Sequence, residues 1–165
     1  MKAASVSDVK KELRLKSEDE LAELLMRMVK YKKENKELIS YLLFDAEDES
    51  QYVNDIKLEI DLAFDEMNKS TIYFIKKSLR KVLRTANKHI KFSGQKTTEV
   101  AILLYFCKKI TELGRSATSN VSVQLIYHRQ IQKIEKALAG MHEDLRFDFT
   151  NDLNELNLPN FEYGY

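Results

Sequence analysis

The sequence has few of the residues that form tight turns. Only four glycines and one proline occur among its 165 residues. A β-protein built from short strands needs turn residues about every ten positions, whereas a helical protein needs fewer. The shortage therefore argues against an all-β fold and favours an all-α one.

The chain also lacks the cysteines of a disulfide framework. Cys107 is the only cysteine, so no intramolecular disulfide can form, and a lone thiol among apolar residues usually behaves as a small hydrophobe. The surrounding run, residues 100–107, is the longest strongly apolar stretch, yet it is far shorter than the ~20 residues that a membrane-spanning helix requires. Residues 1–8 carry no apolar segment of the kind found in secretory signals. We therefore expect a cytoplasmic protein without membrane insertion.

The sequence does contain apolar residues spaced three and four positions apart along most of its length. Leu21, Leu24 and Met28 are typical of this pattern, which indicates helices with one buried side. A hydrophobic content of 44% with 32% charged residues is ordinary for a folded domain. The pattern predicts a single all-helical domain over residues 1–158, with residues 159–165 as a C-terminal tail. Because residues 100–107 are apolar on every side, their helix should be the central one.

Residues suited to helix N-termini indicate how the helices are grouped. Ser17 begins a capping box with Glu20, and Ser50 and either Thr97 or Thr98 are further N-cap candidates. These positions start three helix pairs of unequal length. Near residues 68–70 the apolar stripe shifts, which indicates either a turn or a kink.

Helix pairs of this length and order resemble the HEAT and armadillo kinds of α-solenoid. The chain is also similar to uncharacterised all-helical bacterial families. The resemblance implies stacked antiparallel helical hairpins, with an irregular helical bundle as the alternative fold. It transfers no function, because no repeat-specific residue motif recurs.

One segment has an unusual distribution of charge. Residues 67–98 contain nine basic residues and no acidic one, which leaves −8 for the rest of a chain whose net charge is +1. At 100° per residue, seven of the nine fall within an arc of about 140° on one helix, opposite its apolar stripe. Tyr73 projects from the same arc. The seven basic residues are Lys76, Lys77, Arg80, Lys81, Arg84, Lys88 and Lys91.

Two interpretations of this arc compete. Acidic residues of segment 45–66 could lie beside it and neutralise it, or the arc could remain open and bind a polyanion through its cations, with Tyr73 stacking on a base or sugar. We favour the first, because charged helix faces are usually solvated surface and the chain as a whole is nearly neutral. The residues of the second are Tyr73, Lys76, Lys77, Arg80, Lys81, Arg84 and Lys88.

No pattern of catalytic or metal-binding residues is evident. His89, His128 and His142 are too far apart in sequence to indicate a shared metal site, and no phosphate-binding glycine loop or nucleophile motif occurs. Cys107 lacks the electropositive, partly exposed setting of a reactive thiol. We therefore expect no cofactor and no enzymatic activity. The sequence favours a helical protein-interaction module with an unidentified protein partner, and nucleic-acid or polyanion binding through residues 70–91 is the alternative.

Overall fold

A computed structural model describes residues 2–156 of the protein. Helices make up 81% of the structure, and no strand occurs in the described residues. The all-α prediction is therefore confirmed. The finer prediction of stacked HEAT-like hairpins stays a prediction, and the expected tail at residues 159–165 lies outside the described range.

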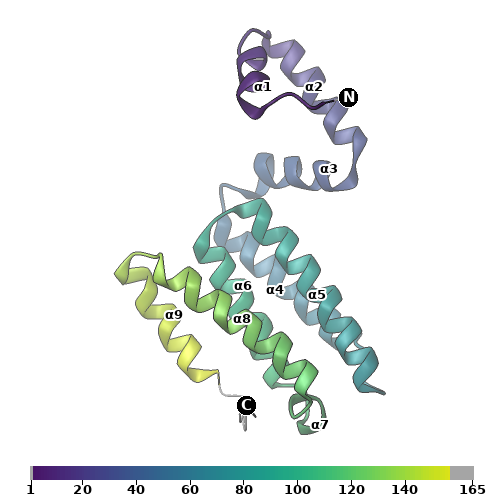
Figure 1. Ribbon diagram of the computed structural model, residues 1–165, viewed down its shortest axis with the longest axis vertical. Coiled ribbons are helices and arrows are strands. Elements are labelled where there is room, and N and C mark those ends of the chain that lie inside the picture. Colours follow the sequence, from purple (N-terminus) through teal and green to yellow (C-terminus); the bar gives the residue numbers. More distant parts are fainter. Residues whose placement is uncertain (1, 157–165) are drawn as a thin grey trace. The chain divides into compact units, whose positions relative to one another are not determined.

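The helices are numbered in chain order in Figure 1. Nine are α-helices within the described range, and one short segment, η1, is a π-helix. Their bounds are α1 (Val6–Leu13), α2 (Glu18–Tyr31), α3 (Lys33–Ser40), η1 (Tyr41–Asp45), α4 (Glu49–Asp65), α5 (Ile72–Ser93), α6 (Lys96–Thr111), α7 (Arg115–Thr118), α8 (Val121–Ala139) and α9 (Glu143–Glu155).

Contacts between residues divide the chain into two units, residues 1–44 and residues 45–165. The prediction of one domain over residues 1–158 stays a prediction. The first unit contains α1, α2 and α3, and none of the described side chains on these three helices is buried. Asn35 joins two of them, since its side-chain amide donates a 2.9 Å hydrogen bond to the carbonyl oxygen of Met28.

The second unit has its core around α6. This helix contacts α4, α5, α8 and α9, and eight of its sixteen residues are buried. Phe106 and Cys107 are both fully buried, and Phe106 packs edge-to-face against Phe64 of α4 with ring centroids 6.0 Å apart. The prediction that residues 100–107 form the central helix is confirmed. Burial also raises the pKa of the Cys107 thiol.

The helix starts agree with the predicted caps at one of three positions. Ser17 forms the predicted capping box with Glu20. The prediction of Ser50 as a cap is wrong, because Asp48 caps α4 by accepting a hydrogen bond from the backbone N–H of Gln51. An ionised carboxylate is a strong acceptor at this position and favours a start two residues earlier.

The predicted cap at Thr97 or Thr98 is also wrong. α6 begins at Lys96 with Gln95 as its N-cap residue. The neighbouring Thr98 is buried and donates its hydroxyl to the Glu49 carboxylate at 2.5 Å. This segment therefore uses a threonine hydroxyl to connect α6 with α4 instead of capping its own helix.

A turn, and not a kink, separates α4 from α5. α4 ends at Asp65, and α5 begins at Ile72 after Thr71, whose hydroxyl caps it. Between them, the Asn68 side chain accepts a hydrogen bond from the backbone N–H of Ser70. Asparagine commonly stabilises turns in this way. No helix in residues 2–156 combines the length and apolar character needed to cross a membrane.

Candidate functional site

The basic face of α5, defined as the seven cations of the predicted arc, is the candidate site. α5 is a 22-residue helix that ends at Ser93, and the following Gly94 caps it with a left-handed φ of 67°, which suits glycine. Its buried residues are Ile75, Leu79, Val82 and Ala86, and it packs against α4 and α6. At 100° per residue the basic face points away from this buried side. Because the apolar side of α5 packs against its neighbours, the cations of the basic face point toward solvent.

Solvent reaches most of the predicted site residues. Lys77, Arg80, Lys81 and Arg84 are exposed, as is Lys91, while Lys76 and Lys88 are partly exposed. Tyr73 is 65% exposed and lies edge-on to Phe74, at 5.4 Å between ring centroids. The ammonium of Lys88 lies 5.9 Å from the Phe92 ring centroid. The structure therefore brings the residues singled out in the sequence together on one accessible surface.

Direct ion pairs do not neutralise most of this face. Within residues 2–156, no carboxylate oxygen lies within the 4.0 Å limit of an ion pair for six of the seven cations. The six are Lys76, Lys77, Arg80, Lys81, Arg84 and Lys91. The neutralisation by acidic residues that the sequence favoured does not occur as direct pairing at these positions.

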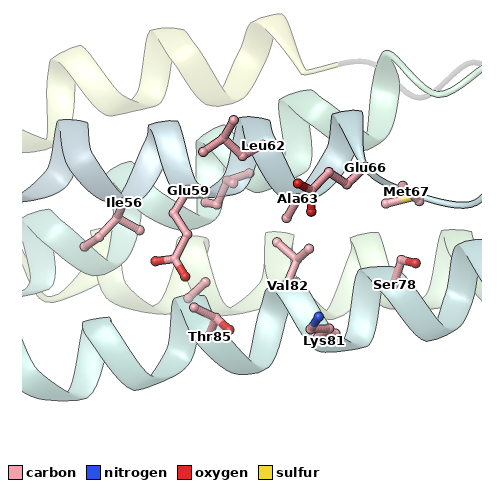
Figure 2. Close-up of a pocket in the computed structure, with 12 residues that line it drawn as sticks. Ile56, Glu59, Leu62, Ala63, Glu66, Met67, Ser78, Lys81, Val82 and Thr85 are labelled. Carbon is pink, nitrogen blue, oxygen red and sulfur yellow. The ribbon is translucent and has the colours of Figure 1, made fainter. Parts of the chain in front are cut away.

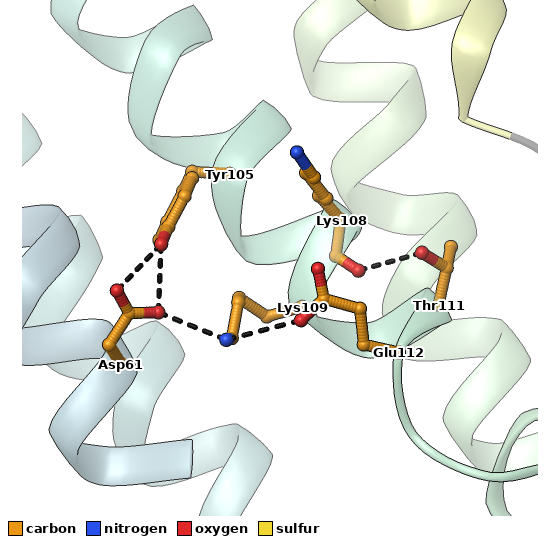
Figure 3. Close-up of polar contacts among 6 residues, drawn as sticks. All are labelled: Asp61, Tyr105, Lys108, Lys109, Thr111 and Glu112. Atoms are coloured by element: carbon orange, nitrogen blue, oxygen red, sulfur yellow. Dashed lines mark hydrogen bonds and ion pairs between the residues drawn. The ribbon is translucent and has the colours of Figure 1, made fainter. Parts of the chain in front are cut away.

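Several acidic residues of segment 45–66 instead bind other partners. Figure 3 shows Asp61 accepting hydrogen bonds from the Tyr105 hydroxyl, at 2.7 and 2.8 Å, and pairing with the Lys109 ammonium at 3.1 Å. Lys109 also pairs with Glu112 at 3.1 Å. These contacts join α4 to α6, on which both partners of Asp61 lie. The charge of Asp61 is thereby directed toward α6 and away from the basic face.

Glu59 has a different partner, on α5 itself. Its carboxylate lies 3.2 Å from Nε2 of His89, and Nδ1 of His89 is 2.8 Å from the hydroxyl of Tyr52. From the sequence, His89 is considered only as a candidate metal ligand. A carboxylate, an imidazole and a phenol in line resemble an activated nucleophile, but Tyr52 is buried, with 7% of its surface exposed. The arrangement therefore serves to join α4 and α5.

A pocket of about 370 Å³ opens between α4 and α5 beside the basic face. Figure 2 shows Glu59 and Glu66 on the α4 side and Lys81 on the α5 side, with Ile56 and Val82 forming part of the apolar wall. The pocket combines both signs of charge over an apolar floor. No group of three or more His, Cys, Asp or Glu side chains suited to a metal ion occurs in the described part of the chain.

The chain matches no protein-family model, no curated protein and no solved structure.

The Asp61 contacts should make stability depend on acid pH. The Tyr105 hydroxyl, followed by Lys109, lowers the pKa of Asp61 from its ordinary 3.8, while burial and the same hydrogen bond raise the pKa of Tyr105 to about 12. A carboxylate with a lowered pKa stabilises the fold above its ordinary pKa and loses this effect as pH falls through the lowered value. We expect Asp61→Asn to reduce the free energy of unfolding by about 1 kcal/mol at neutral pH, with the difference from wild type shrinking below the ordinary pKa.

Urea unfolding at several pH values measures this effect. Asp65→Asn is the matched control, because Asp65 is exposed on the same helix and makes no such contact in the described structure. An Asp61→Asn penalty that is equal at neutral and strongly acid pH would contradict the assignment.

Proposed function

We propose that the protein is a non-enzymatic helical binding protein and that the basic face of α5 binds the phosphate backbone of a nucleic acid. The observation that supports this proposal is that six of the seven cations, Lys88 being the exception, have no carboxylate within ion-pair distance in residues 2–156. Seven cations spread over residues 76–91 cover about 23 Å of helix axis, at 1.5 Å per residue. This is a surface on which several phosphates can bind at once.

Such binding would depend on charge and not on base sequence. Lysine and arginine contacts with phosphates position a protein on nucleic acid without selecting bases. Tyr73 adds an exposed aromatic ring at the N-terminal end of the face, where a base or sugar can stack. Outside residues 67–98 the chain carries a net −8, which disfavours binding elsewhere on the protein and favours one orientation of the polyanion.

The unfavourable self-interaction of the face also supports a bound anion. Lys76 and Arg80, and Arg84 and Lys88, are like-charge pairs one helical turn apart, and each such pair destabilises a helix by about 0.2–0.5 kcal/mol. Phosphates would relieve this repulsion.

A protein partner is the second candidate function. The observation that favours it is the exposed apolar side of α1 and α2, where Leu24, Met28 and Tyr31 are 41%, 56% and 78% exposed. Stacked helical hairpins, the architecture that the sequence predicts, commonly act as protein-interaction modules with extended binding surfaces. This candidate uses a different surface from that of the polyanion.

A salt titration tests the polyanion proposal. Binding of labelled duplex and single-stranded oligonucleotides of unrelated sequence is measured by fluorescence anisotropy at several salt concentrations. With about five phosphates bound, the logarithm of the duplex affinity should fall with the logarithm of salt at a slope of about −4.5. Unrelated sequences should bind equally well. No binding at the lowest salt, or binding insensitive to salt, would rule the proposal out.

A further inference from the structure

The first unit has an apolar groove that none of its own described side chains fills. The groove encloses about 1020 Å³ and is lined by α1 and α2. Its floor contains Val9 and Leu13 of α1 and Leu24, Met28 and Tyr31 of α2, which lie on one side of their helices because they are spaced three and four apart. Each of these five side chains is at least 40% exposed.

A unit of this size needs a core to hold its helices together. Small helical units below about 70 residues are marginal even when their apolar surface is buried. Here α1, α2 and α3 bury no side chain, although the apolar spacing of α1 and α2 is that of helices that pack. A contiguous apolar surface of this kind marks an interaction site. A further surface must cover the groove.

The charges at the groove indicate which surface covers it. Asp8 and Glu12 line the groove from α1, whereas Arg27 and Lys30 line it from α2, and Lys16 in the turn between the helices is paired with Glu20 at 3.0 Å. Among the described residues, Glu12, Arg27 and Lys30 have no ion-pair partner within 4.0 Å. The groove thus has an acidic edge on one helix and a basic edge on the other, and neither edge is paired with the opposite charge across it.

We infer that a second copy of this chain covers the groove, so that the protein forms a two-fold symmetric dimer through α1 and α2. A two-fold axis parallel to the groove sets the acidic edge of each copy against the basic edge of the other. The four helices then enclose one shared apolar layer, as in a four-helix bundle. The inference rests on the second candidate function and names its partner. It is independent of the polyanion surface on α5.

The strongest test is a charge exchange between the two edges. Glu12→Lys and Arg27→Glu each create like-charge contacts across the interface, twice per dimer, and we expect each to weaken dimerisation about tenfold. The double variant Glu12→Lys/Arg27→Glu restores opposite charges and should dimerise like wild type. An equimolar mixture of the two single variants should form a mixed dimer for the same reason.

Sedimentation of the full chain over about 1 to 100 μM measures these equilibria, and far-ultraviolet circular dichroism checks that each variant is helical. Leu24→Glu, which places a charge in the apolar floor, should give a monomer. A wild-type chain that is monomeric throughout the range would overturn the inference, as would single and double variants that associate equally. Neither result would affect the oligonucleotide titration, so failure of the two proposals can be told apart.

Discussion

Replacing Arg80 and Arg84 with glutamate is expected to lower affinity for duplex nucleic acid about 100-fold at ~0.1 M salt, because each phosphate that is no longer bound lowers the affinity roughly tenfold at that concentration. Both side chains are exposed near the middle of the basic face. The salt dependence should become shallower by about two units of slope, one for each arginine replaced. Repulsion between the new carboxylates and the phosphates lowers the affinity further.

The same variant should be slightly more stable than wild type. Glutamate at these two positions turns the pairs with Lys76 and Lys88 from like-charged to opposite, and each opposite pair at this spacing stabilises a helix by about 0.2–0.5 kcal/mol. Weaker binding together with unchanged or increased stability would separate a binding defect from unfolding.

A matched control reverses the same amount of charge elsewhere. Arg129 and Lys136 are exposed on α8, on the side of that helix opposite its buried residues. Arg129→Glu/Lys136→Glu changes the net charge of the chain equally and should reduce affinity less than about threefold. If the control variant binds as weakly as the α5 variant, binding reflects overall charge and the assignment to α5 is wrong.

Replacing Phe106 with alanine is expected to reduce the free energy of unfolding by about 3–5 kcal/mol. Phe106 is the largest of the fully buried side chains and packs against Phe64 across the contact between α6 and α4. Because α6 contacts four other helices, the surrounding side chains cannot easily move in to fill a cavity at this position. Domain stabilities are only about 5–15 kcal/mol, so the variant should be close to unfolding at room temperature.

Urea unfolding followed by circular dichroism measures this effect. Phe147→Ala is the control, because Phe147 is 67% exposed on α9 and its truncation should change stability by no more than about 0.5 kcal/mol. A Phe106→Ala variant as stable as the control would mean that α6 is not the centre of the core.

The spacing of apolar residues predicted correctly which helix, or which side of a helix, is buried. Burial of this kind depends on the side chains of the helix itself. Residues 100–107 are apolar all round, and a helix of this kind can only be stable when it is surrounded. The stripe of α5 likewise predicted which side is buried and, by difference, where its cations lie. Both predictions needed only the order of residues within a single helix, and no information on its neighbours.

Contacts between helices could not be predicted in the same way. Asp61 and Tyr105 are 44 residues apart, and Tyr52 and His89 are 37 apart. Their contacts depend on how far one helix is shifted along another, which is set by the fit of many core side chains at once. The spacing of residues along the chain does not reveal this shift. The sequence therefore favoured neutralisation of α5 by acidic residues of segment 45–66, whereas packing places Asp61 against α6. The cap at Asp48 was not predicted because neighbouring polar residues compete for the same role.

The position of Cys107 has a practical consequence for studying this protein. It is the only thiol in the chain, it is fully covered inside α6, and burial disfavours its reactive thiolate. A thiol reagent can therefore modify the chain only during moments when α6 separates from its neighbours. The unaltered protein thus carries its own probe of core opening, and the rate of labelling reports how often the centre of the second unit is open to water.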